Sequence, residues 1–433
     1  MTKEGVRAMK RLRFIHAADL HLDSPFKGMS ALPERVRERV RESTFEALKE
    51  LVALAIEEQV DFVLVSGDVY DVSDRSLRAQ IRFQRAMEHL ASNDIPAYLI
   101  HGNHDPEDGR AAKLVWPADV HFFASDDVQT YQIVKQDRGL IAEIHGISYR
   151  SSAVTENLAL KFKRGEAHVC QIGLLHTNVD GDPHHDNYAP CSKQDLLDAG
   201  MHYWALGHVH TRTIVNEHPA IVYPGNLQGR SIRETGPRGC YLVEMDEFGR
   251  SELTFQALDT VRWFQEKLSV SGIQTEQELK DRIGELLDRL RQEAQGRDGI
   301  VRIVLEGRSD IHQRLRKGRA LQELIDELRE EEVDRGCFVW IESIEDRTAS
   351  ELDLTVVRQE KSYLGDLLRY GAELMNDEQL LSSFAGEALA ALQGLPQHAG
   401  NPAAATPEQL REWLRAAETL AADLLTADGG WSG

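Results

Sequence analysis

Five short apolar runs, each followed by a segment rich in His, Asp or Asn, constrain this chain more than any other feature. The runs cover residues 12–17, 62–65, 97–100, 172–175 and 203–206, and their β-branched and aliphatic residues predict strands. The polar segments that follow them are 19–21, 67–71, 102–105, 176 and 206–210. Because an open α/β sheet presents the carboxyl ends of its strands at one edge, we expect these segments to meet there. His, Asp and Asn bind divalent cations, so the sequence predicts a metal site at that edge.

In order along the chain, the segments have the patterns DxH, GDxxD, GNHD, a single His, and GHxH. In this set of motifs the chain resembles the calcineurin-type metallophosphoesterases. Within that family it is similar to the SbcD-type DNA nuclease branch, and most of all to the YhaO-like group, in residues 16–26 and 223–230. The resemblance covers roughly residues 9–255, and beyond them only the general layout agrees.

The resemblance implies a centre for two divalent cations, with Asp68 bridging both. The other ligands that it implies are Asp19, His21 and His210 for one cation, and Asn103, His176 and His208 for the other. His104 matches a histidine that lies near the scissile phosphate and binds no metal. Some relatives carry a further histidine three residues after the bridging Asp, where this chain has Asp71, so the role of that histidine does not transfer.

Two cations that share a carboxylate catalyse in-line displacement at phosphorus. We expect His104 either to protonate the leaving oxygen or to stabilise the transition state, because an imidazole titrates near neutral pH. Four imidazoles among the ligands favour Mn²⁺ or a similar transition ion over Mg²⁺, which prefers oxygen ligands. The expected cofactors are therefore two divalent metal ions, with Mn²⁺ preferred.

Two segments beside these motifs are candidates for substrate contacts. One face of a helix expected over 74–90 carries four arginines, which are either contacts to a phosphate backbone or a solvated charged face: Arg75, Arg78, Arg82 and Arg85. After the glycine turn at 225, substrate contact and a structural turn are equally open for Gln228, Arg230 and Arg233. We expect the loop at 180–186, with His184 and His185, to be a polar rim instead of a third metal site.

The implied fold class is α/β: a metallophosphoesterase β-sandwich flanked by helices (αββα), followed by a small α/β capping domain and a helical C-terminal tail. We place these domains at 1–258, 259–348 and 349–433, with a linker near 394–406. Helical spacing predicts helices over 32–58 and 74–90, and short runs within 120–149 predict antiparallel hairpins. Residues 261–344 follow the order strand, helix, strand, helix, strand, with helices over 275–294 and 311–330.

The tail is acidic, and leucines together with Trp413 recur along it at helical spacing. Such a stripe suits either a groove on a partner or packing back onto the body of the protein. In the nucleases that the chain resembles, a helical tail docks onto the coiled-coil base of an SMC-like ATPase, so the resemblance implies this partner. A homodimer is left open.

The whole chain narrows the classes of function further. A net charge of −21 argues against nucleic-acid binding through bulk positive charge, so a DNA substrate needs a local basic patch and the metals. The four cysteines are scattered, which favours reduced thiols. The absence of a membrane-length apolar run or a signal peptide predicts a cytoplasmic protein with no membrane contact, and Met9 is an alternative start.

Three functions compete. The first is a phosphodiesterase that hydrolyses DNA, as an exonuclease or endonuclease, and works with the ATPase in DNA repair. The second is a metallophosphoesterase for small or protein phosphoesters, although protein phosphatases of this family typically show GDxVDRG and GNHE, which residues 67–73 and 102–105 do not match. The third is a scaffold subunit for the ATPase, which the intact ligand set disfavours. We expect the nuclease.

Overall fold

The structure, a computed structural model, describes residues 11–24, 26, 32–71, 76–109, 112–136, 139–165, 168–181, 188–316, 318–350, 354–390 and 405–427. The chain divides into two compact units. The first unit comprises residues 1–264, 290–301 and 333–340, and the second comprises residues 265–289, 302–332 and 341–433. All five polar segments that predict the metal site therefore belong to the first unit.

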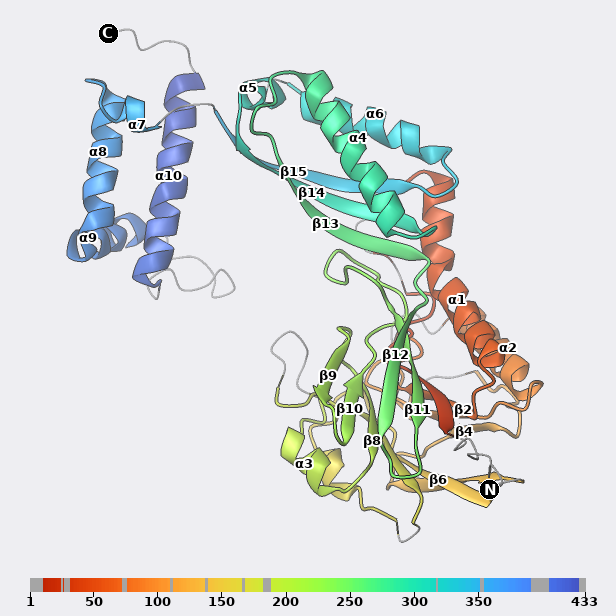
Figure 1. Cartoon of the computed structure of the whole chain (residues 1–433). Coiled ribbons are helices and arrows are strands. Elements are labelled where there is room, and N and C mark those ends of the chain that lie inside the picture. The colour runs from red at the N-terminus through yellow and green to blue at the C-terminus, as the bar shows by residue number, and fades with distance from the viewer. Residues whose placement is uncertain are drawn as a thin grey trace, which may run out of the picture. The chain divides into compact units, whose positions relative to one another are not determined.

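Two six-stranded sheets form the first unit (Figure 1). The first sheet has the order β12-β11-β1-β2-β3-β4, with bounds Ser251–Ala257, Gly239–Met245, Leu12–Ala17, Phe62–Ser66, Ala97–Ile100 and Val120–Phe122. The pairs β1–β2, β2–β3 and β3–β4 are parallel, whereas β11 runs antiparallel to β1 and to β12. The parallel pairs bring the carboxyl ends of β1, β2 and β3 to one edge.

The second sheet has the order β5-β6-β7-β8-β10-β9, with bounds Gln129–Lys135, Gly139–Gly146, Cys170–His176, Tyr203–Gly207, Ala220–Tyr223 and Thr213–Asn216. Here β6, β7, β8 and β10 are parallel neighbours, and β5 and β9 are antiparallel strands at the two borders. The expectation of antiparallel hairpins within 120–149 is therefore confirmed only for β5 and β6. It is wrong for β4, which joins the first sheet in parallel with β3.

The two sheets pack face to face through a core of large apolar side chains. Phe14, Phe62 and Tyr98 of the first sheet share this core with Ile172 and Tyr203 of the second. Their alternation along each strand sends every second residue inward, and the buried area drives the two sheets together. The ring centroids of Phe14 and Phe62 lie 5.0 Å apart in a stacked pair. This sandwich is the centre of the expected fold.

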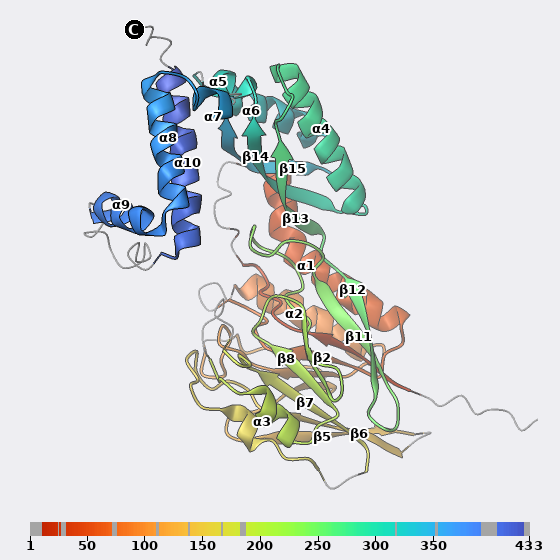
Figure 2. The same cartoon turned by 60° about the vertical axis from the view of Figure 1, so that its left-hand side comes forward.

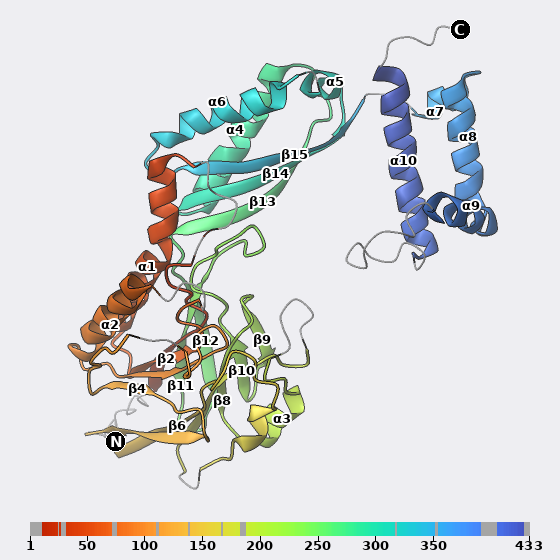
Figure 3. The same cartoon turned by 180° about the vertical axis from the view of Figure 1, so that it is seen from behind.

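Helices cover the outer faces of the sandwich (Figures 2 and 3). On the first sheet lie α1 (Glu34–Glu57) and α2 (Leu77–Ala91), whose buried faces join one apolar cluster with the strands. Ser76 caps α2 by accepting a hydrogen bond from the backbone N–H of Ala79. On the second sheet lie a 3₁₀ turn (Leu158–Lys161) and α3 (Lys193–Asp198). The predicted αββα arrangement and its first two helices are confirmed.

Beyond the sandwich, a three-stranded sheet has the order β13-β14-β15, with bounds Val261–Ser269, Asp298–Arg308 and Val339–Ala349. Its helix α4 (Glu276–Glu293) begins after Thr275, whose hydroxyl accepts from the N–H of Glu278 while the Glu278 carboxylate accepts from the N–H of Thr275. The single helix expected over 311–330 is wrong. Two helices replace it, α5 (Ile311–Leu315) and α6 (Ala320–Val333), and Gly318 between them has φ +64°, which an α-helix does not contain.

The division into compact units passes through this small sheet. The starts of its strands share an apolar core with α1, in which Val36 and Val40 pack with Val261, Ile300 and Trp340. Because this core joins residues on both sides of residue 258, the division does not test the expected domain boundaries at 258 and 348, which stay predictions.

The described residues from 354 onward are largely helical, as expected, and belong to the second unit (Figure 1). The helices are α7 (Leu354–Val357), α8 (Tyr363–Asn376), α9 (Glu378–Ala390) and α10 (Pro407–Ala427). A small core of Val357, Leu364, Leu368 and Ala422 joins α7, α8 and α10. Trp413, Leu420 and Leu424 remain 45%, 53% and 54% exposed.

Some expectations fall outside the described residues, namely Met9, Arg75, His184, His185 and most of the linker. All four cysteines are free thiols. Among the helices that the structure describes, none is long and apolar enough to cross a membrane.

Candidate metal centre

The edge where β1, β2, β3, β7 and β8 end gathers the polar segments from both sheets. Three groups of His and Asp side chains there offer ligand atoms within 4.8 Å of one another. The backbone at Asp19, His21, Asp68 and His208 has positive φ, which is rare for residues other than glycine. Such strained conformations concentrate at functional sites, where the surrounding structure fixes them.

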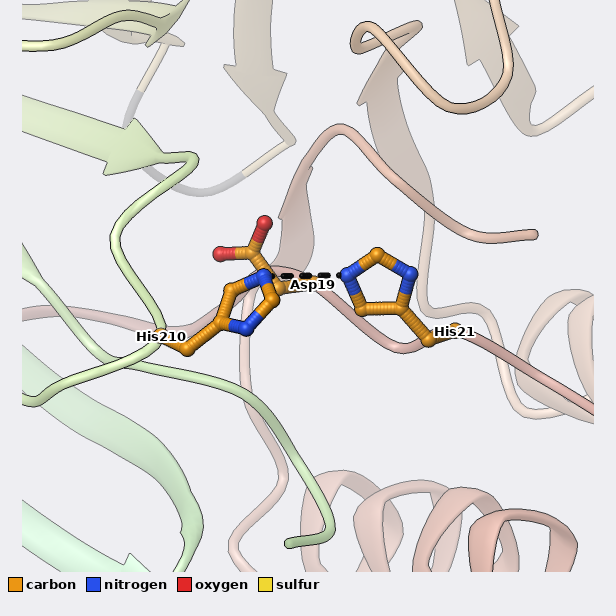
Figure 4. A group of neighbouring side chains, drawn as sticks. All are labelled: Asp19, His21 and His210. Carbon is orange, nitrogen blue, oxygen red and sulfur yellow. Dashed lines mark hydrogen bonds between the residues drawn. The ribbon is translucent and has the colours of Figure 1, made fainter. Parts of the chain in front are cut away.

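The first group consists of Asp19, His21 and His210 (Figure 4). The Nε2 atoms of His21 and His210 lie 3.1 Å apart. On the far side of each ring, Nδ1 donates to a carboxylate at 2.8 Å, that of Asp71 for His21 and that of Glu234 for His210. In the tautomer that donates from Nδ1, Nε2 is an acceptor, so the two Nε2 atoms face each other. A cation between them satisfies both.

The charge state of His21 supports this assignment. Burial, and next the positive charge of Arg230, lower the pKa of His21 to about 3. The imidazole is therefore neutral, which is the form that binds metal.

The second group surrounds His176, whose side chain is fully buried. Its Nδ1 donates to the backbone carbonyl of Ser66 at 2.8 Å, so Nε2 faces the cluster. That Nε2 lies 3.0 Å from Asn103 Oδ1 and 3.4 Å from Asp68 Oδ2, and His208 Nδ1 lies 3.2 Å from the same Asn103 oxygen. Imidazole, amide and carboxylate atoms therefore converge here as well.

Asp68 lies between the two groups. Its Oδ2 is 3.4 Å from His176 Nε2 and 4.0 Å from His21 Nε2, while its Oδ1 accepts the backbone N–H of His104 at 2.8 Å. Burial alone would raise the pKa of Asp68, but His176, His21 and His104 hold it well below its usual range. Burial alone would lower the pKa of His176, but Asp68 and then Asp19 raise it to about 9. The buried carboxylates of the cluster therefore need compensating positive charge, and the donor set of the cluster fits divalent cations.

His104 projects beside this cluster, with 41% of its side chain exposed. Its Nδ1 lies 3.1 Å from the Oδ1 atom of Asp71 that also accepts from His21. Burial lowers the pKa of His104, but the hydrogen bond to Asp71 and the charges of Asp68 and Asp71 raise it above its ordinary value. The imidazole is therefore oriented by Asp71, and the raised pKa favours its proton-donating form.

Three carboxylates that the sequence analysis did not assign support the centre from behind. Asp71 holds His21 and His104, and Glu234 holds His210. Asp105, which is 1% exposed, accepts the backbone N–H groups of Val69 and Gly102, both at 2.8 Å. Asp71 and Asp105 end two of the recognised motifs, so their positions were an available signal. Glu234 has no such signal.

The predicted substrate contacts separate into two sets. Arg230 reaches the centre: its guanidinium is 3.2 Å from the Ser24 hydroxyl and 3.5 Å from Asp71, and it donates to Glu234 at 3.3 Å. Arg233 is exposed on the same loop. Gln228 is 1% exposed, and its amide bonds the backbone of Val261 and Thr260. These contacts are the ones that a structural turn predicts.

Arg78 and Arg82 point to α1. Both pair with Glu42, Arg78 also lies 3.3 Å from Asp23, and both guanidinium groups stack on the Phe45 ring. Carboxylates of the chain therefore already neutralise much of their charge. This arrangement differs from both alternatives, a phosphate-backbone track and a solvated charged face, because the two guanidinium groups are paired within the chain.

Comparison with known proteins finds two family matches. The calcineurin-like phosphoesterase family matches residues 12–212, and the middle domain of metallophosphoesterase YhaO matches residues 263–349. The chain is 39% identical over 345 residues to the uncharacterized metallophosphoesterase YhaO of Bacillus subtilis, covering 79% of this chain and 84% of that protein.

Two more distant relatives are named a nuclease subunit and a DNA double-strand break repair protein. The chain is 23% identical to one of the subunits of the nuclease SbcCD of Bacillus subtilis, covering 52% of this chain and 64% of that one. It is 28% identical to the DNA double-strand break repair protein Mre11 of Thermoplasma acidophilum, covering 51% and 57%. The chain thus spans less than two thirds of either relative. Together, the matches confirm the resemblance that the motifs predict.

Proposed function

The chain belongs to the calcineurin-like metallophosphoesterase family, and from this premise we propose that it is a two-metal phosphodiesterase that hydrolyses DNA. One observation carries the proposal: imidazole, amide and carboxylate groups from five strand ends converge on a buried carboxylate. The two Nε2 atoms lie 3.1 Å apart, and the Asp68 oxygen lies 3.4 Å and 4.0 Å from imidazole nitrogens of the two groups, an arrangement that bound cations would satisfy.

The residues that would hold the cations are those expected: Asp19, His21 and His210 on one side, Asn103, His176 and His208 on the other, and Asp68 between. Bound divalent cations supply Lewis acidity, which activates water and neutralises charge on the phosphate. Mixed imidazole and carboxylate donors favour Mn²⁺.

The chain itself supplies the proton and the orientation. His104, held by Asp71 Oδ1 at 3.1 Å, donates a proton to the leaving oxygen, and its raised pKa keeps that proton available near neutral pH. Arg230 is placed at the same edge to bind a non-bridging phosphate oxygen, because its guanidinium presents several donors in a fixed plane. Glu234 fixes both Arg230 and His210.

DNA as the substrate is supported by the two relatives whose names state nuclease and double-strand break repair activity. The net charge of −21 leaves only local positive charge for a phosphate backbone, and Arg233, exposed on the loop that carries Arg230, provides it beside the centre. We propose that the remaining partner is an SMC-like ATPase, bound through the exposed Trp413, Leu420 and Leu424 of α10.

The test uses the full chain loaded with Mn²⁺. End-labelled duplex and hairpin DNA are compared with a small chromogenic phosphodiester and its phosphomonoester. Arg233→Gln should slow DNA cleavage and spare the small diester, because only the long substrate reaches this exposed side chain. Arg11→Gln, which changes an exposed arginine paired with Glu244 and Glu252, is the matched control. A phosphomonoester turned over far faster than any DNA would make the chain a small-ester hydrolase instead.

A further inference from the structure

A cavity of about 600 Å³ opens at the edge of the second sheet opposite the metal centre. It lies where β8 and β10 begin, because His202 directly precedes β8 and Pro219 directly precedes β10. His208 follows the other end of β8, roughly 20 Å away at ~3.3 Å per residue. The turn between β11 and β12 completes the wall with residues 248–250. The cavity is therefore separate from the centre described above.

The lining of this cavity is cationic, although the chain carries a net charge of −21. Arginine and histidine supply its polar groups: Arg164, Arg250, His202 and His218. Among the described residues that line it, none is Asp or Glu, and Leu197 and Met201 add apolar surface. Two guanidinium groups with apolar walls select a ligand that has both an anionic and an apolar part.

The hydrogen bonds of His202 indicate where the anion lies. The backbone N–H of Gln171 donates to His202 Nδ1 at 2.9 Å, so Nδ1 is the acceptor and Nε2 carries the proton of the neutral ring. The Arg164 guanidinium, which only donates, approaches that Nε2 at 3.2 Å. Two donors therefore point at each other. An anionic oxygen beside both would accept from each and relieve the conflict.

The orientation of the His202 ring is fixed by close packing. Gly249 lies so near that an added Cβ would come within 2.4 Å of the ring, and its φ of +80° also favours glycine. Burial, and then Arg164, lower the pKa of His202, which agrees with a neutral ring. The imidazole therefore cannot turn away from the guanidinium at low cost.

Phe248 gives the cavity a flat apolar face. It is 69% exposed at the tip of the β11–β12 turn and lies next to Arg250. An exposed phenyl ring beside two guanidinium groups offers stacking to a planar ring whose phosphate the arginines hold. The volume is within the ~300–1,000 Å³ typical of small-molecule sites.

We propose that this cavity is a second ligand site, which binds a phosphomonoester carried on a planar ring, the chemical class of the nucleoside monophosphates. Arg164, His202 and Arg250 bind the phosphate, and Phe248 stacks on the ring. The site is independent of phosphodiester hydrolysis, since its described lining includes none of the expected metal ligands.

Isothermal titration of the full chain, freed of metal by a chelator, tests the site with 5′-AMP and inorganic phosphate as probes. Arg164→Gln and Arg250→Gln should each weaken AMP binding about tenfold, the loss expected for one charge-assisted hydrogen bond. Phe248→Ala should weaken AMP binding and leave phosphate binding unchanged. Arg11→Gln, the same charge change on another part of the first unit, should alter neither.

Two results would overturn the proposal. One is an affinity for AMP that is the same in the unchanged chain and in a chain with both arginines replaced. The other is an AMP affinity that Phe248→Ala leaves intact, which removes the planar ring from the ligand class. Circular dichroism of each variant establishes that the fold is retained, so that a loss of binding is attributed to the cavity.

Discussion

Replacing Asp71 by Asn is the sharpest test of the candidate centre, because one carboxylate oxygen serves two imidazoles with different roles. Asp71 Oδ1 lies 2.8 Å from His21 Nδ1 and 3.1 Å from His104 Nδ1, while Oδ2 faces the Ser24 hydroxyl and Arg230. The replacement amide can keep its oxygen toward the two imidazoles, but its NH₂ group then faces the Arg230 guanidinium. In the opposite orientation, the NH₂ group faces both Nδ1–H groups. Neither orientation restores the contacts of the carboxylate.

Two separable effects follow. Loss of a carboxylate behind a metal-binding histidine typically weakens metal binding by ~10–100-fold, so the cation held by His21 should be released more easily. Loss of an oriented general acid costs ~10²–10⁴-fold in rate, and part of this should persist at saturating Mn²⁺ because His104 is then misplaced.

The direction in which the pH–rate profile should shift follows from the charge of Asp71. Asp71 raises the pKa of His104, and the acid form of His104 is the active one, so activity declines as pH rises through that pKa. In Asp71→Asn the pKa of His104 falls, and the alkaline limb of the rate profile should move to lower pH.

The assay combines a chelator competition for metal affinity with pH–rate profiles at saturating Mn²⁺. Glu244→Gln, which alters a carboxylate paired with Arg11 and Arg13 far along β11, is the control and should behave like the unchanged chain. Unaltered metal affinity together with an unmoved alkaline limb in Asp71→Asn would refute the reasoning.

Further predictions concern the other parts of the centre and the tail. Asp68→Asn should release both metals and abolish hydrolysis, and full metal content by elemental analysis would contradict its bridging position. His104→Ala should retain two metals while the rate falls by ~10²–10⁴-fold, and loss of metal would make His104 a ligand. Glu234→Ala should weaken the binding of only the cation held by His210, as measured by stepwise metal titration. Equal weakening for both cations would contradict the support that Glu234 gives to His210. A chain that ends at Ala349 should bind metal but fail to capture the ATPase in a pull-down, whereas an unfolded product would show that the tail is needed for the fold.

The local pattern of the sequence was sufficient for the strands that position the centre. β1, β2, β3, β7 and β8 lie within two residues of their expected bounds, because each is a dense apolar run ended by a polar motif. The break at Gly318 was not predicted, since the apolar spacing continues on both sides and only the backbone conformation of the glycine interrupts it.

Charge partners distant in the sequence were the harder part. Arg78 and Arg82 share a helix face, which is visible in the sequence, but their partner Glu42 lies on α1, a separate helix that precedes β2. Glu234 likewise meets His210 only because the chain folds back after β10. Ligand types could be read from motifs, whereas the groups that hold those ligands depend on tertiary packing.

The centre draws Asp19, His21 and Asp68 from the ends of the first sheet, and His176, His208 and His210 from the ends of the second. Cations bound there tie the two halves of the sandwich together at one edge, as a cross-link would. Because the unfolded chain cannot assemble such a cage, free metal at a hundred times its dissociation constant adds ~2.7 kcal/mol to the resistance of the sandwich to unfolding. In the proposed two-metal centre, the supply of metal would therefore set the stability of the fold as well as its reactivity.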